Sequence, residues 1–534
     1  RNGIRANNLG KGALSITTTG ETTGGTGHGI YAYNAGSGGT SITVASTGSI
    51  ETSADKGYGI FNKSSGTAAK LNEITVAGTI NTTGAGAHGI VQDGGTSITN
   101  ISGTVSAKGN SAAAVFHKFG SGHTVNLAES ALIIGSISAA NEASNNKLNL
   151  NEDADFALTI GGAPDDGEPG LGTGAGQWSF QLVDEQGLPS NKGQNVDFVE
   201  VDASNCATGS TICVKAIYEE PSVEDQFEEI TNIDNDPLVD SLELGGSDKS
   251  GSSTTTAAQA HHNTVWANVY GIKTTGDETD SRAEMKSRTA GFTIGVPIRT
   301  NSDLNWDLVF NMSDSKNKLG STGDQELNVQ SYNLGAVFYN IAPSSGWDVD
   351  AFGFIGYNDY DQERDVRDNT EADGIDTRKY SYSGNEILLG FDAEYYKPFN
   401  ETLDLKFGVD GFLSHQKIDS YSTGEYYKWD TRNMTQGSIG VSTGVEHRKG
   451  ALMAYADIGV DYVTLLSGKT ADYSFNGQSR SFTASDTDDV YGKVNVGFEY
   501  NQSENVIIDG KLSGFSSTGG ISGYAATLGI EVNF

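Results

Sequence analysis

Three residues whose side chains can bind metal ions or carry protons recur at one position of a repeated sequence. His28 and His88 each precede a Gly-Ile pair, and Tyr58 takes the same place between them. If the repeats stack as β-coils, two strand spacings separate the histidines by about 9.6 Å, whereas zinc holds its ligands at about 2 Å. We therefore expect a structural ladder of stacked side chains rather than a shared metal ion.

Two further patterns are typical of chemistry in other proteins. Gly84, Gly86 and Gly89 fit the GxGxxG spacing of dinucleotide-binding loops, but no strand-then-helix context surrounds them, so we interpret them as corner glycines. Cys206 and Cys213 are the two cysteines of the chain and lie close enough to close one small loop. A disulfide there suits an oxidising compartment, and two unpaired thiols are the alternative.

Residues 1–218 contain neither a GxSxG elbow nor an HExxH motif, so we predict no catalytic residue, no cofactor and no metal site. One acidic segment in the C-terminal half could bind calcium, but its spacing lacks the glycine and the final glutamate of an EF-hand loop. A solvated loop is the simpler expectation for its carboxylates, Asp359, Asp361, Asp365 and Asp368.

The composition favours an all-β protein that does not bind nucleic acid. Of 534 residues 70 are Gly and only 8 are Pro, which fits strands and turns better than helices. The formal net charge of −34 argues against the basic surface that nucleic-acid binding needs. No run of about 18 apolar residues occurs, so we expect no transmembrane helix. Since the chain starts at Arg1 inside a repeat, we expect a processed or truncated piece.

The N-terminal part of the chain repeats with an irregular period of about 30 residues. Three rows of apolar residues recur, so each repeat supplies three short strands. Such a repeat cannot bury its apolar side alone, but stacked coils form one continuous core. We predict a right-handed parallel β-helix over residues 1–150. The rows are Ile30, Ile60, Ile90 and Val115; Ile42, Ile74, Ile98 and Val125; and Ile50, Ile80, Val105 and Ile137.

Two segments follow the repeats. Residues 151–218 alternate strand-like stretches with Gly/Pro/Asp loops, and we expect a β-rich cap there, because stacked coils leave an open end. Residues 219–262 begin with carboxylates and continue into Gly, Ser and Thr, which indicates a linker. Asp236 before Pro237, with Gly245 further on, marks a short helix in it. The linker is either solvated or threaded through a pore.

Residues 263–534 read as segments of about ten residues in which apolar and polar residues alternate, the period of β-strands. Five connections are tight, and the six between them are mostly long and polar, which is typical of a transmembrane barrel. We predict twelve antiparallel strands, with the longest loop from about Asp359 to Ser381. The tight connections lie around Thr300, Pro343, Asn400, Gly450 and Ser503.

The two faces of these strands carry different candidate sites. The last strand has one oily face and ends on phenylalanine, which resembles the C-terminal signal read by the outer-membrane assembly machinery; its candidate residues are Tyr524, Leu528, Gly529, Ile530, Val532 and Phe534. The opposite faces are polar, and the candidates for the lumen are Lys406, Asp410, Lys493, Glu499 and Lys511. Acidic linker residues such as Glu224 are expected near these lysines, because a low dielectric strengthens ion pairs.

In this arrangement the chain resembles the classical (type V) autotransporters of Gram-negative bacteria. A β-helical passenger, a cap, a linker and a final barrel follow in the family's order, and VWANVYG at 265–271, GFTIGV at 291–296 and GIEVNF at 529–534 look like its first, second and last barrel strands. The resemblance implies a passenger that reaches the surface through barrel biogenesis and folds from its C-terminal end with the cap as template. Residues 219–262 lack an Asn-Asn pair, so we expect no self-cleavage in the pore.

We therefore predict an outer-membrane autotransporter, not an enzyme, that displays residues 1 to about 218 on the cell surface as an adhesive or interaction passenger. The expected partners are outer-membrane lipids, the barrel-assembly machinery and an unidentified surface or host ligand, and the barrel is expected to be monomeric. The alternatives are a surface-displayed enzyme whose catalytic part lies upstream of Arg1, and a porin or transporter.

Overall fold

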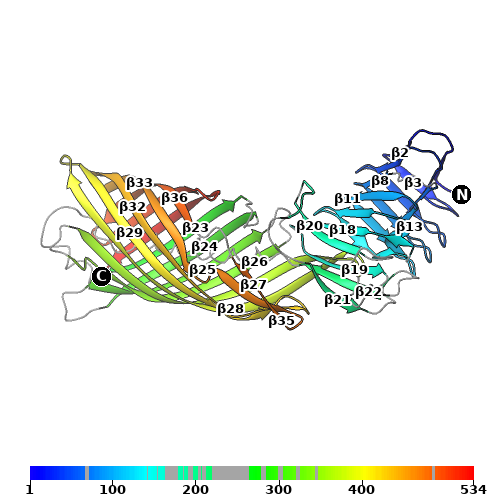
Figure 1. The fold of residues 1–534 in the computed structure, drawn as a ribbon. Helices are drawn as coiled ribbons and strands as arrows, with labels where there is room; N and C mark the ends of the chain where they lie inside the picture. Colours follow the sequence, from blue (N-terminus) through cyan, green and yellow to red (C-terminus); the bar gives the residue numbers. More distant parts are fainter. Residues whose placement is uncertain are drawn as a thin grey trace. The chain divides into compact units, whose positions relative to one another are not determined.

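The computed structural model describes residues 1–65, 71–140, 142–152, 154–162, 178–184, 186–190, 196–201, 206, 212–218, 264–277, 284–298, 305–319, 325–342, 347–483 and 488–534. The regular elements in these ranges are all β-strands, and none of the described residues forms a helix long and apolar enough to span a bilayer. The chain divides into unit 1, Arg1–Glu220 with Asp365–Thr377, and unit 2, Pro221–Arg364 with Arg378–Phe534 (Figure 1). The helix predicted within 219–262 lies outside the described residues.

Unit 1 is a parallel β-helix with three strands in each coil, as the repeats predicted. Its first sheet contains β1 (Ile4–Asn8), β4 (Ile30–Asn34), β7 (Ile60–Ser64), β10 (Ile90–Asp93), β13 (Ala113–Ser121) and β16 (Ser136–Ala139). Its second contains β2 (Leu14–Thr18), β5 (Thr40–Val44), β8 (Leu71–Val76), β11 (Thr96–Ile101), β14 (His123–Leu127), β18 (Asn146–Asn151) and β20 (Trp178–Val183). Its third contains β3 (Glu21–Gly24), β6 (Ser49–Thr52), β9 (Thr79–Thr82), β12 (Thr104–Ala107) and β15 (Leu132–Ile134).

Inward-pointing residues of equivalent strands stack into the rows that form the core. Ile30, Ile60 and Ile90 pair in register and are fully buried, as predicted. The second row was predicted wrongly at Ile98, because Thr99 is the residue that pairs with Ile74 and is buried.

The end of the third row was also predicted wrongly. Val105 pairs with Ile133, whereas Ile137 pairs with Val115 and continues the first row. The four residues are all buried. The last coils are shorter than the earlier ones, and this moves Ile137 from the third side of the coil to the first.

The coils end in strands of mixed direction. β19 (Phe156–Gly162) runs parallel to β16 but antiparallel to β22 (Ile212–Tyr218), and β21 (Asp197–Val201) is antiparallel to β22. A two-residue strand, β17 (Ala143–Ser144), joins β13. Antiparallel pairing interrupts the repeat of parallel edges on which a further coil would stack.

Unit 2 contains a barrel of twelve strands in which each strand pairs with its neighbours along the chain. The first strand, β23, is antiparallel to the last, β38, so the predicted barrel is closed (Figure 1). The strands are β23 (Thr264–Gly276), β24 (Met285–Pro297), β25 (Asn305–Leu319), β26 (Gln325–Tyr339), β27 (Asp348–Asp368), β28 (Ile375–Pro398), β29 (Leu403–Ile418), β32 (Arg432–Lys449), β33 (Leu452–Ser467), β36 (Asp488–Ser503), β37 (Val506–Ser517) and β38 (Ile521–Asn533). A small antiparallel sheet comes from two of the long connections: β30 (Tyr421–Ser422), β31 (Tyr427–Trp429), β34 (Thr470–Phe475) and β35 (Gln478–Thr483).

The loop predicted from Asp359 to Ser381 was wrong. β27 continues to Asp368 and β28 begins at Ile375, so a short turn joins two long strands. The acidic side chains are spaced along β27 and make separate contacts: Asp361 accepts a hydrogen bond from Ser381 at 2.5 Å and Asp365 one from Thr377 at 2.6 Å. They therefore do not form the convergent set of ligands that calcium requires.

We predict that Ile60→Ala destabilises unit 1 by about 2–4 kcal/mol, because it opens a cavity in a fully buried row. Ile98→Ala is the matched control, since its side chain points away from the core and should cost less than about 1 kcal/mol. Urea unfolding of the full chain in detergent, followed by the fluorescence of the buried Trp178, measures both. Equal losses would contradict the assignment of the rows.

Candidate functional site

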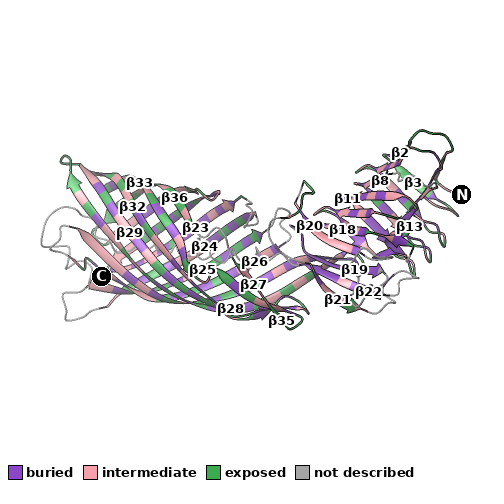
Figure 2. Ribbon diagram, viewed as in Figure 1, coloured by how far each residue is buried: buried purple, intermediate pink, exposed green. Residues whose placement is uncertain are grey.

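The outer surface of the barrel is a continuous belt of exposed apolar side chains. Among its residues, Val441 is 57% exposed, Ile458 is 59% exposed and Leu528 is 54% exposed. Water-soluble monomers rarely expose connected apolar areas larger than a few hundred Å². Exposed and buried residues alternate along each strand (Figure 2), as lipid outside and a polar lumen inside require. Further members of the belt are Val269, Ile294, Leu308, Leu334, Ile355, Leu389, Phe407, Val460, Val494, Val496, Leu512 and Ile530.

The inner surface of the barrel carries charged residues, some of which form ion pairs. Lys406 forms an ion pair with Glu394, and Lys493 forms one with Asp461. The side-chain amide of Asn495 donates to Asp457 at 2.7 Å. Two lysines of the inner surface are therefore each paired with a carboxylate of a neighbouring strand.

Four of the five lumen candidates, Lys406, Asp410, Lys493 and Lys511, line one polar cavity inside the barrel. The fifth, Glu499, lies on the same face of β36 as Lys493 and accepts a hydrogen bond from Asn501 at 3.2 Å. The linker residues expected beside these lysines lie outside the described part of the chain, so that pairing stays a prediction. Sequence reasoning did not find the ion-pair partners Glu394 and Asp461, although alternation places both on the polar face.

The candidate assembly signal occupies the strand that closes the barrel. Tyr524, Leu528, Ile530 and Phe534 are exposed on the oily face, and Val532 is partly exposed. Gly529 is buried on the opposite face, where it pairs with Asn268 of β23 and Asp509 of β37. A Cβ atom at Gly529 would collide with the side-chain oxygens of both neighbours, so a larger residue there would require the side chains of Asn268 and Asp509 to move.

The histidines of the repeats form the predicted ladder. The His28 and Tyr58 rings stack at 4.9 Å between centroids, and Tyr58 and His88 stack at 5.3 Å. Nδ1 of His28 accepts the backbone N–H of Tyr58 at 3.0 Å, and Nδ1 of His88 accepts that of Ala113 at 2.8 Å. An imidazole that accepts a hydrogen bond through one nitrogen has to be neutral. Burial favours this neutral form, because it lowers the pKa of His28 and lowers the pKa of His88 to about 4.

A second pair of histidines, which the sequence did not single out, is fully buried next to the cap. The rings of His117 and His123 are 4.5 Å apart, and His117 also stacks on Trp178 at 5.1 Å. Nε2 of His123 donates to the carbonyl of Phe119 at 3.1 Å, which leaves Nδ1 to accept from the hydroxyl of Ser97 at 2.7 Å. Burial lowers the pKa of His123 to about 4, and burial together with the neighbouring His123 holds the pKa of His117 well below 6.5.

We predict that unit 1 loses stability as the pH falls from about 6.5 to 4. In this range the unfolded histidines bind protons and the folded ones do not, so the free energy of unfolding rises with pH. The two histidines with pKa values of about 4 should together change the free energy of unfolding by several kcal/mol. Urea unfolding at pH 7.5, 6.0, 5.0 and about 4.5 measures the slope.

The matched variant for this titration is His123→Gln, which keeps hydrogen-bonding groups but cannot be protonated in this range. Its stability should depend less steeply on pH than that of the unsubstituted chain. A free energy of unfolding that stays constant from pH 7.5 to about 4.5 would refute the histidine assignment.

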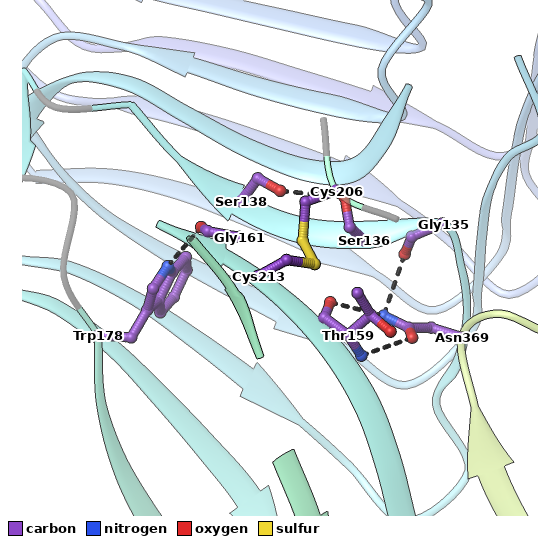
Figure 3. Close-up of a disulfide and its surroundings, with 9 residues drawn as sticks. All are labelled: Gly135, Ser136, Ser138, Thr159, Gly161, Trp178, Cys206, Cys213 and Asn369. Carbon is purple, nitrogen blue, oxygen red and sulfur yellow. Dashed lines mark hydrogen bonds between the residues drawn. A yellow bond between two sulfur atoms is a disulfide. The ribbon is translucent and has the colours of Figure 1, made fainter. Parts of the chain in front are cut away.

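The cap contains the disulfide and several hydrogen bonds between side chains and backbone groups (Figure 3). Cys206 and Cys213 are joined, with their Cα atoms 5.9 Å apart. Cys213 lies on β22 opposite Gly161, whose carbonyl accepts the indole N–H of Trp178 at 3.3 Å. Asn369 lies in the same view and bonds to Thr159 and Gly135.

The family of the barrel follows from a comparison with known proteins. Residues 265–513 match the sequence model of the family described as the autotransporter beta-domain. The C-terminal half of this chain is an autotransporter beta-domain. The family and the twelve-stranded barrel that the sequence predicted are thereby confirmed.

Solved structures of autotransporters are similar to the chain at low sequence identity. The translocator domain of NalP from Neisseria meningitidis has a TM-score of 0.45 and 14% identity, with 57% of this chain and 98% of that chain covered. The transport unit of AIDA-I from Escherichia coli has a TM-score of 0.38 and 13% identity, with 56% and 97% covered. The beta domain of the Bordetella autotransporter BrkA has a TM-score of 0.37 and 12% identity, with 51% and 100% covered. No curated protein matches the sequence.

We predict that Val441→Arg prevents the autotransporter beta-domain from folding in a bilayer, because a cation on the lipid face costs about 2–4 kcal/mol near the membrane centre. Val441→Leu keeps the face apolar and should fold like the unsubstituted chain. The folded fraction in lipid vesicles is measured by gel migration with and without heating. Equal folding of both variants would contradict the contact of Val441 with lipid.

Proposed function

We propose that this chain is an outer-membrane protein whose barrel anchors residues 1–218 and mediates their export to the cell surface. The observation that carries the proposal is the closed twelve-stranded barrel with a continuous apolar outer belt, in a segment that matches the autotransporter beta-domain. A closed barrel satisfies every backbone group inside the wall, which is the condition for crossing a bilayer with strands.

We further propose that the displayed part is an interaction or adhesive module rather than an enzyme. A β-helix with a side of each coil open to solvent offers a long surface to a partner on another cell or on a host. Its histidines are engaged in structural hydrogen bonds, and three of them, His88, His117 and His123, are buried, which favours a scaffold over acid-base chemistry. Outer-membrane lipids, the barrel-assembly machinery and a surface ligand are the partners that this proposal requires, with a monomeric barrel.

Lysine labelling in intact cells tests the topology. A membrane-impermeant amine reagent should modify Lys11, Lys56 and Lys108 of unit 1, which are exposed. Lys397 and Lys449, which are exposed beside tight turns of the barrel, should react only after the outer membrane is permeabilised. Mass spectrometry of the labelled peptides reads out each site.

The controls separate display from leakage. The Val441→Leu chain should give the same pattern, and the Val441→Arg chain should give no labelling in intact cells. Labelling of Lys449 without Lys11 in intact cells would reverse the topology and refute the proposal.

A further inference from the structure

The outer surface of the first sheet of unit 1 carries aromatic side chains. In β4 and β7, Tyr31 and Phe61 pair in register and are partly exposed, whereas the isoleucine before each of them belongs to the core. Every Phe, Tyr and Trp of residues 1–140 lies on a strand of this sheet or in the turn that leads into it, namely Tyr31, Tyr33, Tyr58, Phe61, Phe116 and Phe119. These rings are therefore concentrated on one side of the coils.

The rings stack on one another along the axis of the coils. The Tyr31 and Phe61 rings are 5.5 Å apart between centroids, and the guanidinium of Arg5 lies over the Tyr31 ring, 5.4 Å from its centroid. Two strands further on, the rings of His88 and Phe116 stack at 4.6 Å. Because neighbours along the axis cover their faces, the rings turn mainly their edges to solvent. The edge of an aromatic ring carries partial positive charge.

The charged residues of the first sheet are mostly cations. Its strands contain three cationic residues and one carboxylate: Arg5, Lys63, Lys118 and Asp93. The strands of the second and third sheets contain three carboxylates and one lysine: Glu21, Glu51, Glu73 and Lys147. Since the chain has 68 Asp and Glu residues against 34 Lys and Arg residues, a cationic surface does not follow from the composition. It is a property of this side of the coils.

The three cations lie on every second strand. The strands β1, β4, β7, β10 and β13 pair in this order, and Arg5, Lys63 and Lys118 are on the first, third and fifth of them. Two strand spacings place successive cations about 9.6 Å apart along the coil axis. Lys118 also pairs with Asp93 at 3.4 Å, but its side chain is 46% exposed, and ion pairs in such positions are weak. Its ammonium group can therefore contact a ligand as well.

We propose that this surface binds an acidic polysaccharide that lies along the coil axis. Two linked sugar rings are about as long as two strand spacings, so a polymer with one carboxylate in every second sugar reaches each cation in turn. Between the cations, the positive ring edges face the hydroxyl and ether oxygens of the sugars. The inference rests on the proposed interaction role of unit 1 and adds the class of its ligand. The surface is called the cationic strip below and consists of Arg5, Tyr31, Phe61, Lys63, Phe116 and Lys118.

The spacing favours a polysaccharide over an acidic peptide. An extended peptide strand places the side chains of one face about 6.8 Å apart, twice the rise per residue, which does not match cations at about 9.6 Å. The overall negative charge of the chain does not prevent binding, because at physiological ionic strength charges more than about 8 Å away are largely screened. The cations of the strip therefore dominate the electrostatics at its own surface.

The test measures binding to the full chain purified in nonionic detergent. The probe is a fluorescent hyaluronan fragment, which has one carboxylate in every second sugar, and fluorescence anisotropy reports the bound fraction. Binding should be saturable and should weaken at least about fivefold between about 50 and 300 mM salt, because salt screens ion pairs. A fragment whose carboxylates have been reduced to alcohols should bind at least about tenfold more weakly, because it cannot form charge-assisted hydrogen bonds.

Charge reversal on two sides of the coils locates the site. Lys63→Glu reverses the central cation of the strip and should weaken binding about tenfold. Lys147→Glu is the matched control, because Lys147 is a partly exposed lysine on β18 of the second sheet, and it should change the affinity less than about twofold. Urea unfolding followed by Trp178 fluorescence should show that both variants are folded under the conditions of the binding assay.

Replacement of one ring tests the aromatic part of the strip. Phe61→Leu keeps an apolar side chain but removes the ring edge, and it should weaken binding about fivefold while unit 1 stays folded. If this variant loses stability but binds as tightly as the unsubstituted chain, the rings serve only the packing of the coils. That result would overturn the strip as the binding surface.

Four other results would also overturn the proposal. The first is no binding of the hyaluronan fragment at about 50 mM salt, where screening is weak. The second is equal weakening by Lys63→Glu and Lys147→Glu, which indicates diffuse attraction. The third is binding of polyglutamate as tight as that of the fragment, which identifies an acidic peptide as the partner. The fourth is a dimer that forms in sedimentation without the probe and is lost in Lys63→Glu, which assigns the strip to a second copy of the chain.

The binding assay and the surface labelling can fail separately. Failure of the labelling would refute the proposed export and leave the binding to the purified chain unchanged. Failure of the binding would refute the polysaccharide ligand and leave the labelling pattern unchanged.

Discussion

Every strand in this chain has two rows of backbone donors and acceptors, and the need to pair them governs both units. In lipid no water is available to satisfy an open edge, and each unpaired group costs several kcal/mol. The wall of the barrel therefore has to close, and β23 meets β38 from Thr264 opposite Asn533 to Gly276 opposite Ile521. Closure leaves no unpaired backbone group in the wall. The outer faces of the strands can then consist of apolar side chains that contact lipid.

The strand edges of the β-helix also have to be paired. Water can solvate an open edge, but such an edge can still pair with a strand of another chain. Its coils pair with one another, and the backbone of the last strand of the first sheet, β19, is paired in three ways. It binds the antiparallel strand β22, the strand residues Arg367 and Asp368, and the side-chain amide of Asn369. The disulfide between Cys206 and Cys213 closes a small loop of the chain beside this edge. In the polar interior of the barrel, Lys406 and Lys493 are likewise paired with carboxylates on neighbouring strands.

The sequence predicted the strands in which one face must be apolar. The prediction was wrong for segments in which both faces can be polar. Alternation identified the twelve strands, but β27 and β28 extend past the apolar belt, where both faces can be polar, so 359–381 looked like a loop. Thr99 was missed in the core because its branched shape fills a position that hydrophobicity alone assigns to Ile98. The bonds of Asn369 join residues 210 positions apart and address backbone groups, so they leave no pattern in the side chains that sequence reasoning could have used.

The uniform register of the coils has a consequence for how such chains diversify. Ile30, Ile60 and Ile90 repeat the same packing, and each strand pairs only with the strands before and after it. A whole coil inserted or lost ahead of β13 therefore lengthens or shortens the stack without altering Gly135, Thr159 or the turn that binds them. Natural selection can change the reach of this module by duplication of about 30 residues, while the anchored end stays untouched.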